Sequence, residues 1–178
     1  MTIAPNLESL LGECAQALEA AQSFVDTLLA QLRRVLDRAG NANEALTREQ
    51  ASAHGLAWAA TYVRALREMH GWASRLSKAG RAGELEALLL GAAFAEYLAQ
   101  LADGLPISQS EIFRSRALDP DGAARAAFES DAAVSRLMRD GFAPQVRGRI
   151  TALLAAGADS REFGQTGELD PTLAEIRT

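Results

Sequence analysis

The stretch Glu84–Asp103, ELEALLLGAAFAEYLAQLAD, is the most apolar segment of this 178-residue chain. As a helix it carries apolar groups on nearly every face, and a helix of that kind is usually buried. We therefore expect Leu88 and Leu89 to lie in a core. Acidic residues interrupt the segment, whereas a membrane span needs about 20 nearly uncharged residues. Because Gly104 can adopt the left-handed backbone of a helix stop, the sequence predicts that this segment is the central helix of a soluble bundle.

The composition indicates one globular, mostly helical domain. Charged residues make up 23% and hydrophobic residues 48% of the chain, a balance typical of folded rather than disordered proteins. Alanine and leucine dominate, while valine, isoleucine and threonine are sparse, which favours helix over sheet. The net charge of −5 argues against generic binding to nucleic acid, which needs a basic face. The first residues lack the basic start and apolar run of a signal peptide.

The first predicted helix runs from a cap at Asn6 to Ala39 and stops at Gly40. Apolar residues recur along it at steps of three and four, so they share one face. Cys14, the single cysteine, lies on that face and can form no internal disulfide, which fits a reducing compartment. Because no basic residue lies within a turn of it, we expect a small core residue rather than a nucleophile.

A second long helix is predicted after a short linker at residues 41–46. Thr47 and Gln50 have the spacing of a capping box, in which each side chain satisfies an amide at the helix start. The helix is expected to run to Ala79 and to stop at Gly80.

Four side chains on this second helix invite a functional interpretation. Trp58 and Tyr62 lie one turn apart and could form a ligand platform, but helical spacing alone explains them. We expect them to pack in the core or at a domain interface. His54 and His70 lie sixteen residues apart, on nearly opposite sides of the helix, so they cannot share a metal through it. With no cluster of ligands around either one, we expect surface or interface histidines.

Glu96, in the central segment, could be either a catalytic base or a surface residue. A carboxylate among apolar neighbours could have a raised pKa and act as a base. The alternative is that Glu96 faces solvent or pairs with an arginine across the bundle. We expect the alternative, because no second catalytic group is identifiable in the sequence.

Three further helices are predicted after Gly104. Ser108 and Glu111 match another capping box, followed by a short helix from Gln109 to about Ala117. A second helix opens at Asp119-Pro120 and ends near Asp140-Gly141. The last has Pro144 in its first turn and ends at Gly157.

The charges of this region are balanced, with seven arginines against six acidic residues between Glu111 and Ile150. Such a balance is typical of a solvated surface rather than of a phosphate site. Arg147 and Arg149 could still contact a nucleotide, but no glycine-rich phosphate loop, GxSxG or HExxH motif accompanies them. The sequence therefore assigns no catalytic, cofactor-binding or metal-binding residue.

The end of the chain differs from the rest. We expect residues 1–157 to form a helical bundle and residues 158–178 to form a linker with the truncated start of a following helix or domain. The polar, glycine-containing stretch Ala158–Leu169 is typical of a linker. Asp170-Pro171 is a strong helix start, yet Thr178 follows within a few residues. This pattern is expected of a chain cut from a longer protein or of a shortened gene product.

Three stretches carry a resemblance to a known family: HGLAWAATYVRALREMHGWA at 54–73, EALLLGAAFAEYLAQLADGLPISQSEIFR at 86–114, and FGQTGELDPTLAEIR at 163–177. Over most of its length the chain resembles the N-terminal extension of bacterial acyl-CoA dehydrogenases of the methylsuccinyl-CoA dehydrogenase type. The family uses FAD and a glutamate base to remove hydrogens alpha and beta to a thioester carbonyl. The resemblance implies that the flavin and the base belong to a core following Thr178. Glu96 matches no family base.

Three hypotheses follow. The first is a non-catalytic helical accessory domain of a cytoplasmic, FAD-dependent acyl-CoA dehydrogenase, packed on the dehydrogenase core or between subunits. The second is a free-standing helical protein that binds a partner or self-associates. The third is a small helical enzyme that uses Glu96 or Glu111. None of the three implies a membrane or a nucleic acid as partner.

Overall fold

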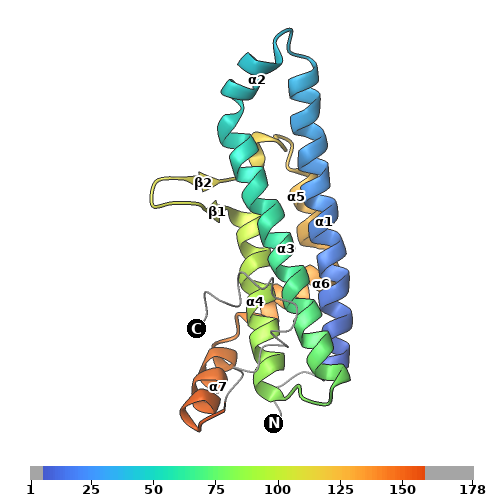
Figure 1. Ribbon diagram of the computed structural model, residues 1–178, viewed down its shortest axis with the longest axis vertical. Helices are drawn as coiled ribbons and strands as arrows, with labels where there is room; N and C mark the ends of the chain where they lie inside the picture. The colour runs from blue at the N-terminus through green and yellow to red at the C-terminus, as the bar shows by residue number, and fades with distance from the viewer. Residues whose placement is uncertain (1–5, 159–178) are drawn as a thin grey trace, which may run out of the picture.

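The computed structural model describes residues 6–158. Within that range three long helices lie side by side, and two short helices in succession, α5 and α6, form a fourth column against them (Figure 1). The predicted all-α bundle with four or five main helices is confirmed. The elements are α1 Leu7–Asp37, α2 Ala42–Arg48, α3 Gln50–Lys78, α4 Glu84–Asp103, β1 Leu105–Pro106, β2 Ile112–Phe113, the 3-10 turn η1 Ser115–Ala117, α5 Ala123–Ser130, α6 Ala132–Gly141 and α7 Pro144–Ala155.

Helix α1 begins as predicted, because the side chain of Asn6 accepts a hydrogen bond from the Glu8 amide at 3.0 Å. Its apolar face packs on α3, α4, α5 and α6. Phe24 on this face stacks on Phe128 of α5, with ring centroids 4.9 Å apart and planes at 7°. Cys14 is fully buried on the same face, which confirms the core position predicted for it.

Helix α4 is the centre of the bundle and contacts α1, α3, α6 and α7. Phe94, Leu90 and Leu98 of this helix are completely buried. By length and hydropathy α4 would suffice to cross a membrane, but 56% of that stretch is buried inside the bundle, as in the core helix of a soluble protein. Leu88 is buried as expected, whereas the core position expected for Leu89 is wrong, because it faces the open side of α4 and is only partly buried.

Helices α4 and α6 cross with their backbones close together. A Cβ atom on Gly141 of α6 would lie 2.6 Å from the Gly91 carbonyl oxygen of α4 and 2.5 Å from the Ala95 Cβ. Only a glycine fits at this crossing, since backbone atoms cannot rotate away as a side chain can. The small residues of the quoted segment therefore have a structural purpose.

The predicted linker at residues 41–46 and the capping box after it are wrong. The side chain of Asn41 accepts hydrogen bonds from the amides of Asn43 and Glu44, and this cap starts the short helix α2. Thr47 lies inside that helix, where its hydroxyl donates to the Asn43 carbonyl at 2.9 Å. It is therefore unavailable to cap α3, which begins without a side-chain cap at Gln50.

A β-hairpin replaces the short helix predicted from Gln109 to Ala117. Leu105 pairs with Phe113 and Pro106 with Ile112, and the hairpin projects from the side of the bundle (Figure 1). The Phe113 ring lies directly on Gly55 of α3, where a Cβ atom would come within 2.6 Å of the Phe113 Cβ. This contact with a distant glycine, which local spacing cannot show, holds the segment extended.

The single helix predicted from Asp119-Pro120 to Asp140-Gly141 is two helices. Asp131 interrupts it, because its carboxylate caps α6 by accepting from the amides of Ala133 and Val134 at 2.9 and 3.0 Å. Asp119 is buried and accepts from the Ala124 and Arg125 amides at the start of α5. Each acidic residue thus starts a helix of its own.

Helix α7 has Pro144 at its start, as predicted, and Gly157 follows it with a φ of +85°. It packs on α4, apart from α1 and α3 (Figure 1). The linker predicted at 158–169 lies, except for Ala158, outside the described residues, and so does the helix start at Asp170-Pro171.

Candidate functional site

The seam between α3 and α4 is lined by aromatic side chains that remain accessible. Tyr62 of α3 stacks on Tyr97 of α4, with ring centroids 4.6 Å apart and planes at 27°. Both rings are partly buried and pack on the hydrophobic core, as predicted for Tyr62. Trp58, one turn before Tyr62, is 40% exposed, so the core packing considered for it is wrong. Packing at an interface stays a prediction for Trp58.

A chain of polar contacts joins this seam to α7. The Tyr62 hydroxyl donates to Gln100 Oε1 at 2.9 Å, and Gln100 Nε2 donates to Glu96 Oε1 at 2.9 Å. The other Glu96 oxygen lies 3.6 Å from Arg147 Nη2 of α7. Three helices therefore contribute to one row of side chains, Tyr62–Gln100–Glu96–Arg147, which fixes the orientation of the Tyr62 ring.

The phenol of Tyr62 stays protonated at neutral pH. Partial burial raises its pKa, and the neighbouring Tyr97 and Glu96 raise it further, because each would repel or destabilise the phenolate. A protonated hydroxyl is what the hydrogen bond to Gln100 requires.

Glu96 itself has the position that the sequence favoured. It pairs with Arg147 across the bundle, its side chain is 46% exposed, and its second oxygen is held by Gln100. A general base needs a free carboxylate aimed at a reacting proton. Here one oxygen of Glu96 accepts from Gln100 and the other faces Arg147, and that Glu96 is not a base stays a prediction.

His54 ties the hairpin to α3. Its Nδ1 lies 3.1 Å from Glu111 Oε1, and the Trp58 indole N–H donates to its Nε2 at 3.0 Å. Because an indole nitrogen can only donate, Nε2 must accept, and the proton of the neutral ring lies on Nδ1, facing Glu111. Both ring nitrogens are thus engaged, and neither is left to activate a nucleophile. Glu111 acts as an anchor for the hairpin in this arrangement.

His70 lies elsewhere, as its spacing from His54 predicted. Its Nε2 is 3.2 Å from the Leu11 carbonyl oxygen, so it joins α3 to α1. Among residues 6–158 no group of three or more His, Cys, Asp or Glu side chains could hold a metal ion. Cys14 is no nucleophile either, since burial raises the pKa of its thiol to about 12 and Glu13 adds to the shift.

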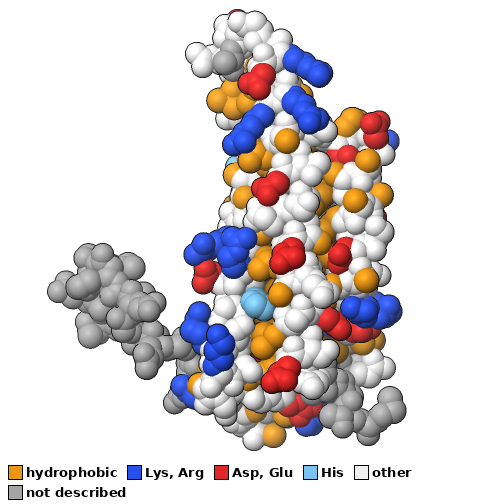
Figure 2. Space-filling model, turned by 90° about the vertical axis from the view of Figure 1, so that its right-hand side faces the viewer, with side chains coloured by type: hydrophobic (Ala, Val, Ile, Leu, Met, Phe, Trp, Pro, Cys, Tyr) orange, Lys and Arg blue, Asp and Glu red, His pale blue; other side chains and the backbone are white. Residues whose placement is uncertain are grey.

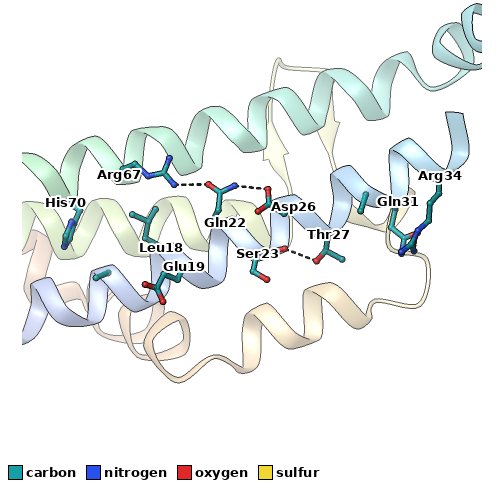
Figure 3. A pocket seen from close by; sticks show the side chains of 12 residues that line it. Leu18, Glu19, Gln22, Ser23, Asp26, Thr27, Gln31, Arg34, Arg67 and His70 are labelled. Atoms are coloured by element: carbon teal, nitrogen blue, oxygen red, sulfur yellow. Dashed lines mark hydrogen bonds between the residues drawn. The ribbon is translucent and has the colours of Figure 1, made fainter. Parts of the chain in front are cut away.

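A second open face is the groove between α1 and α3, with a volume of about 770 Å³ (Figure 3). Gln22 of α1 accepts from Arg67 of α3 at 3.0 Å, which bridges the two sides, and it donates to Asp26 on its own helix at 2.9 Å. Glu19 and Arg34 also line it. On the surrounding face, acidic and basic side chains are interspersed (Figure 2).

This groove does not fit FAD. The pyrophosphate of a dinucleotide is bound by backbone amides at a helix start or a glycine-rich loop. The groove is built from the middles of two helices, whose amides are already paired, and its two arginines, Arg34 and Arg67, are balanced by the carboxylates of Glu19 and Asp26.

The arginines considered for a nucleotide are already paired. Arg147 faces Glu96, and Arg149 makes two hydrogen bonds to Glu84 at 2.7 and 2.6 Å. Sequence reasoning allowed for an arginine opposite Glu96 without identifying Arg147, and it missed the pairing of Arg149 with Glu84 and the places of Tyr97 and Gln100 at the seam. The spacing of Glu96 and Gln100, four residues apart on one helix, was the one local signal that could have revealed part of this row.

The sequence also has a relative of known name. No protein-family model matches the chain. It is 39% identical over 178 residues to a (2S)-methylsuccinyl-CoA dehydrogenase of Cereibacter sphaeroides, a match that takes in 99% of this chain and 31% of the relative. Nearly the whole of this chain is therefore related to that dehydrogenase, as the resemblance predicted. The chain spans less than a third of the relative's own length. That the match lies at the relative's N-terminus stays a prediction.

Proposed function

We propose that this chain is a non-catalytic helical domain of an FAD-dependent acyl-CoA dehydrogenase that oxidises (2S)-methylsuccinyl-CoA. One observation carries the proposal. Nearly the whole chain is 39% identical to a region that makes up less than a third of a dehydrogenase. A match of that kind is expected of one domain within a larger enzyme.

The chemistry of the bundle supports a structural role. Glu96 and Glu111, the two carboxylates considered as bases, are engaged by Arg147 and His54. The open groove between α1 and α3 is unsuited to a dinucleotide, as argued above. In this proposal the flavin, which accepts the hydride, and the base both belong to the remaining polypeptide. The domain packs on that catalytic body or between subunits, in the cytoplasm.

A domain exchange tests the proposal. The matched region of the Cereibacter sphaeroides dehydrogenase is replaced by this chain, and turnover of (2S)-methylsuccinyl-CoA is compared among the intact enzyme, the chimera and an enzyme lacking the region. We expect the chimera to regain stability and turnover that the deletion loses. A chimera no better than the deletion would contradict the proposal.

A flavin measurement complements the exchange. The 178-residue chain and the chimera are each incubated with excess FAD, desalted and examined by visible absorption. We expect a retained flavin band only for the chimera. A band retained by the chain alone would place a flavin site within these residues and would overturn the non-catalytic assignment. Concentration-dependent self-association of the isolated chain, with a chimera that fails, would instead favour the free-standing interaction protein.

A further inference from the structure

We propose that the open seam between α3 and α4 is the surface on which the catalytic body of the dehydrogenase docks, an inference that rests on the proposed function. The surface, called the aromatic seam here, consists of Trp58, Tyr62, Met69, Leu89, Ala93 and Tyr97.

Spacing along the two helices makes the aromatic seam continuous. Trp58, Tyr62 and Met69 recur at steps of four and seven on α3, so they share one side of that helix. Leu89, Ala93 and Tyr97 recur at steps of four on α4. The Tyr62–Tyr97 stack joins the two rows. All six side chains keep some exposure to solvent.

The chemistry of this surface fits a protein partner better than water. Tryptophan and tyrosine are the residues that most often anchor interfaces, and a tryptophan left 40% exposed keeps apolar area that a partner can cover. The charges at the edge of the seam, Glu96 and Arg147, neutralise each other. The partner surface is therefore expected to be apolar and uncharged.

The other open face lacks this character. The groove between α1 and α3 is lined partly by small or aliphatic residues and partly by charged and amide side chains that already bond to one another, such as Arg67, Gln22 and Asp26 (Figure 3). None of its described lining residues is Trp, Tyr or Phe, and covering it would also remove its charged and amide groups from water. The two faces thus differ in kind, and the aromatic seam is the better docking surface.

The end of the bundle where α1 begins and α7 lies favours the catalytic body as the occupant of the aromatic seam. The start of α1 and the whole of α7 lie at the same end of the bundle (Figure 1). Helix α4 also begins at that end, and Leu89 of the aromatic seam lies in its second turn. More than two thirds of the relative's length falls outside the matched region, enough for a body that covers the seam.

The row of polar contacts gives the seam a fixed shape before any partner arrives. The Tyr62–Gln100 hydrogen bond and the stack on Tyr97 hold both rings. A surface ordered in advance loses less side-chain entropy on binding.

Cysteine accessibility in the chimera tests the docking surface. Trp58→Cys is compared with Phe142→Cys, a matched control because Phe142 is 38% exposed on the α6–α7 connection. Cys14 is buried, with its thiol pKa raised to about 12, so it adds little background. Thiol labelling is followed by peptide mass mapping in the isolated chain and in the chimera. We expect labelling at position 58 to slow by an order of magnitude or more in the chimera, while labelling at position 142 changes little.

Because Trp58→Cys could itself disturb docking, amide hydrogen exchange is also measured on the unsubstituted chain and chimera. We expect α3 and α4 along the seam to be more protected in the chimera than in the isolated chain. Equal labelling at position 58 and equal exchange in a chimera that turns over (2S)-methylsuccinyl-CoA would overturn the docking surface and leave the proposed function standing. An inactive chimera overturns both. Self-association of the isolated chain that Trp58→Ala abolishes would show a second copy as the occupant and would also overturn the inference.

Discussion

Arg149 of α7 and Glu84 of α4, which are 65 positions apart in the sequence, form a bidentate ion pair. The Arg149 Nε donates to one carboxylate oxygen at 2.7 Å and Nη2 donates to the other at 2.6 Å. Glu84 begins α4, where a negative charge is also stabilised by the helix dipole. The pair fastens α7 to the first turn of the central helix.

We predict that α7 loosens in acid. The hydrogen bonds and charge of Arg149 lower the pKa of the Glu84 carboxyl. A lowered pKa in the folded state gives a stabilisation that is present above the ordinary pKa and is lost as the pH falls through the folded value. Amide exchange in α7 should rise several-fold at acidic pH relative to the bundle, and in Glu84→Gln at neutral pH. The exposed neighbouring pair Arg139 and Asp140 supplies the control, because Asp140→Asn should leave α7 unchanged.

We predict that Leu90→Ala lowers the free energy of unfolding by about 2–5 kcal/mol, since Leu90 is completely buried and its truncation leaves a cavity. Leu89→Ala, on the open side of the same helix, should cost roughly 1 kcal/mol. Urea unfolding of both variants measures the difference. Equal costs would contradict the orientation of α4.

We predict opposite effects for two glycine substitutions. Gly141→Ala should destabilise the protein by about 1–3 kcal/mol, because its methyl group meets the Gly91 carbonyl at the α4–α6 crossing. Gly148→Ala, in α7 with open space around it, should stabilise helix α7 by about 0.5–1 kcal/mol through helix propensity. Thermal unfolding of Gly141→Ala and amide exchange in α7 of Gly148→Ala distinguish them. A neutral Gly141→Ala would show that the crossing is looser than described.

We predict a loss of stability in alkali that depends on Cys14. Burial raises its thiol pKa from 9.0 to about 12. The stabilisation of the folded state by the neutral thiol is therefore fully present below pH 9, and it is lost as the pH rises through the folded pKa. The full loss is on the order of 4 kcal/mol. In Cys14→Ala, urea unfolding should show a smaller decrease over the same pH window. An identical decrease would show that the thiol does not titrate in the core.

We predict that Glu96→Gln changes the free energy of unfolding by no more than about 0.5 kcal/mol, because exposed ion pairs contribute little. The amide keeps an oxygen that can accept from Gln100. Turnover of the chimera should also be unchanged. Loss of turnover in this variant, with the fold intact, would make Glu96 catalytic after all.

Local sequence determined much of the fold. The steps of three and four place Cys14 and its neighbours on one face of α1. The cap at Asn6 starts α1, and Pro144 lies in the first turn of α7, both as predicted. Gly80 and Gly157, both with positive φ, end helices near the predicted positions. These features depend on residues within a turn or two of each other, so the sequence contains the whole signal.

The candidate site depended on contacts that no local pattern shows. The hairpin forms because Phe113 lies on Gly55, and the seam exists because Tyr62 meets Tyr97, each pair brought together by the packing of distant helices. The partners of Glu96 and Glu84 were likewise set by where α7 packs. Hydrophobic periodicity determines which face of a helix is buried, but it does not determine which other helix covers that face. The tertiary structure alone decided which polar and aromatic side chains share the open side of α3 and α4, because that choice depends on how whole helices fit together.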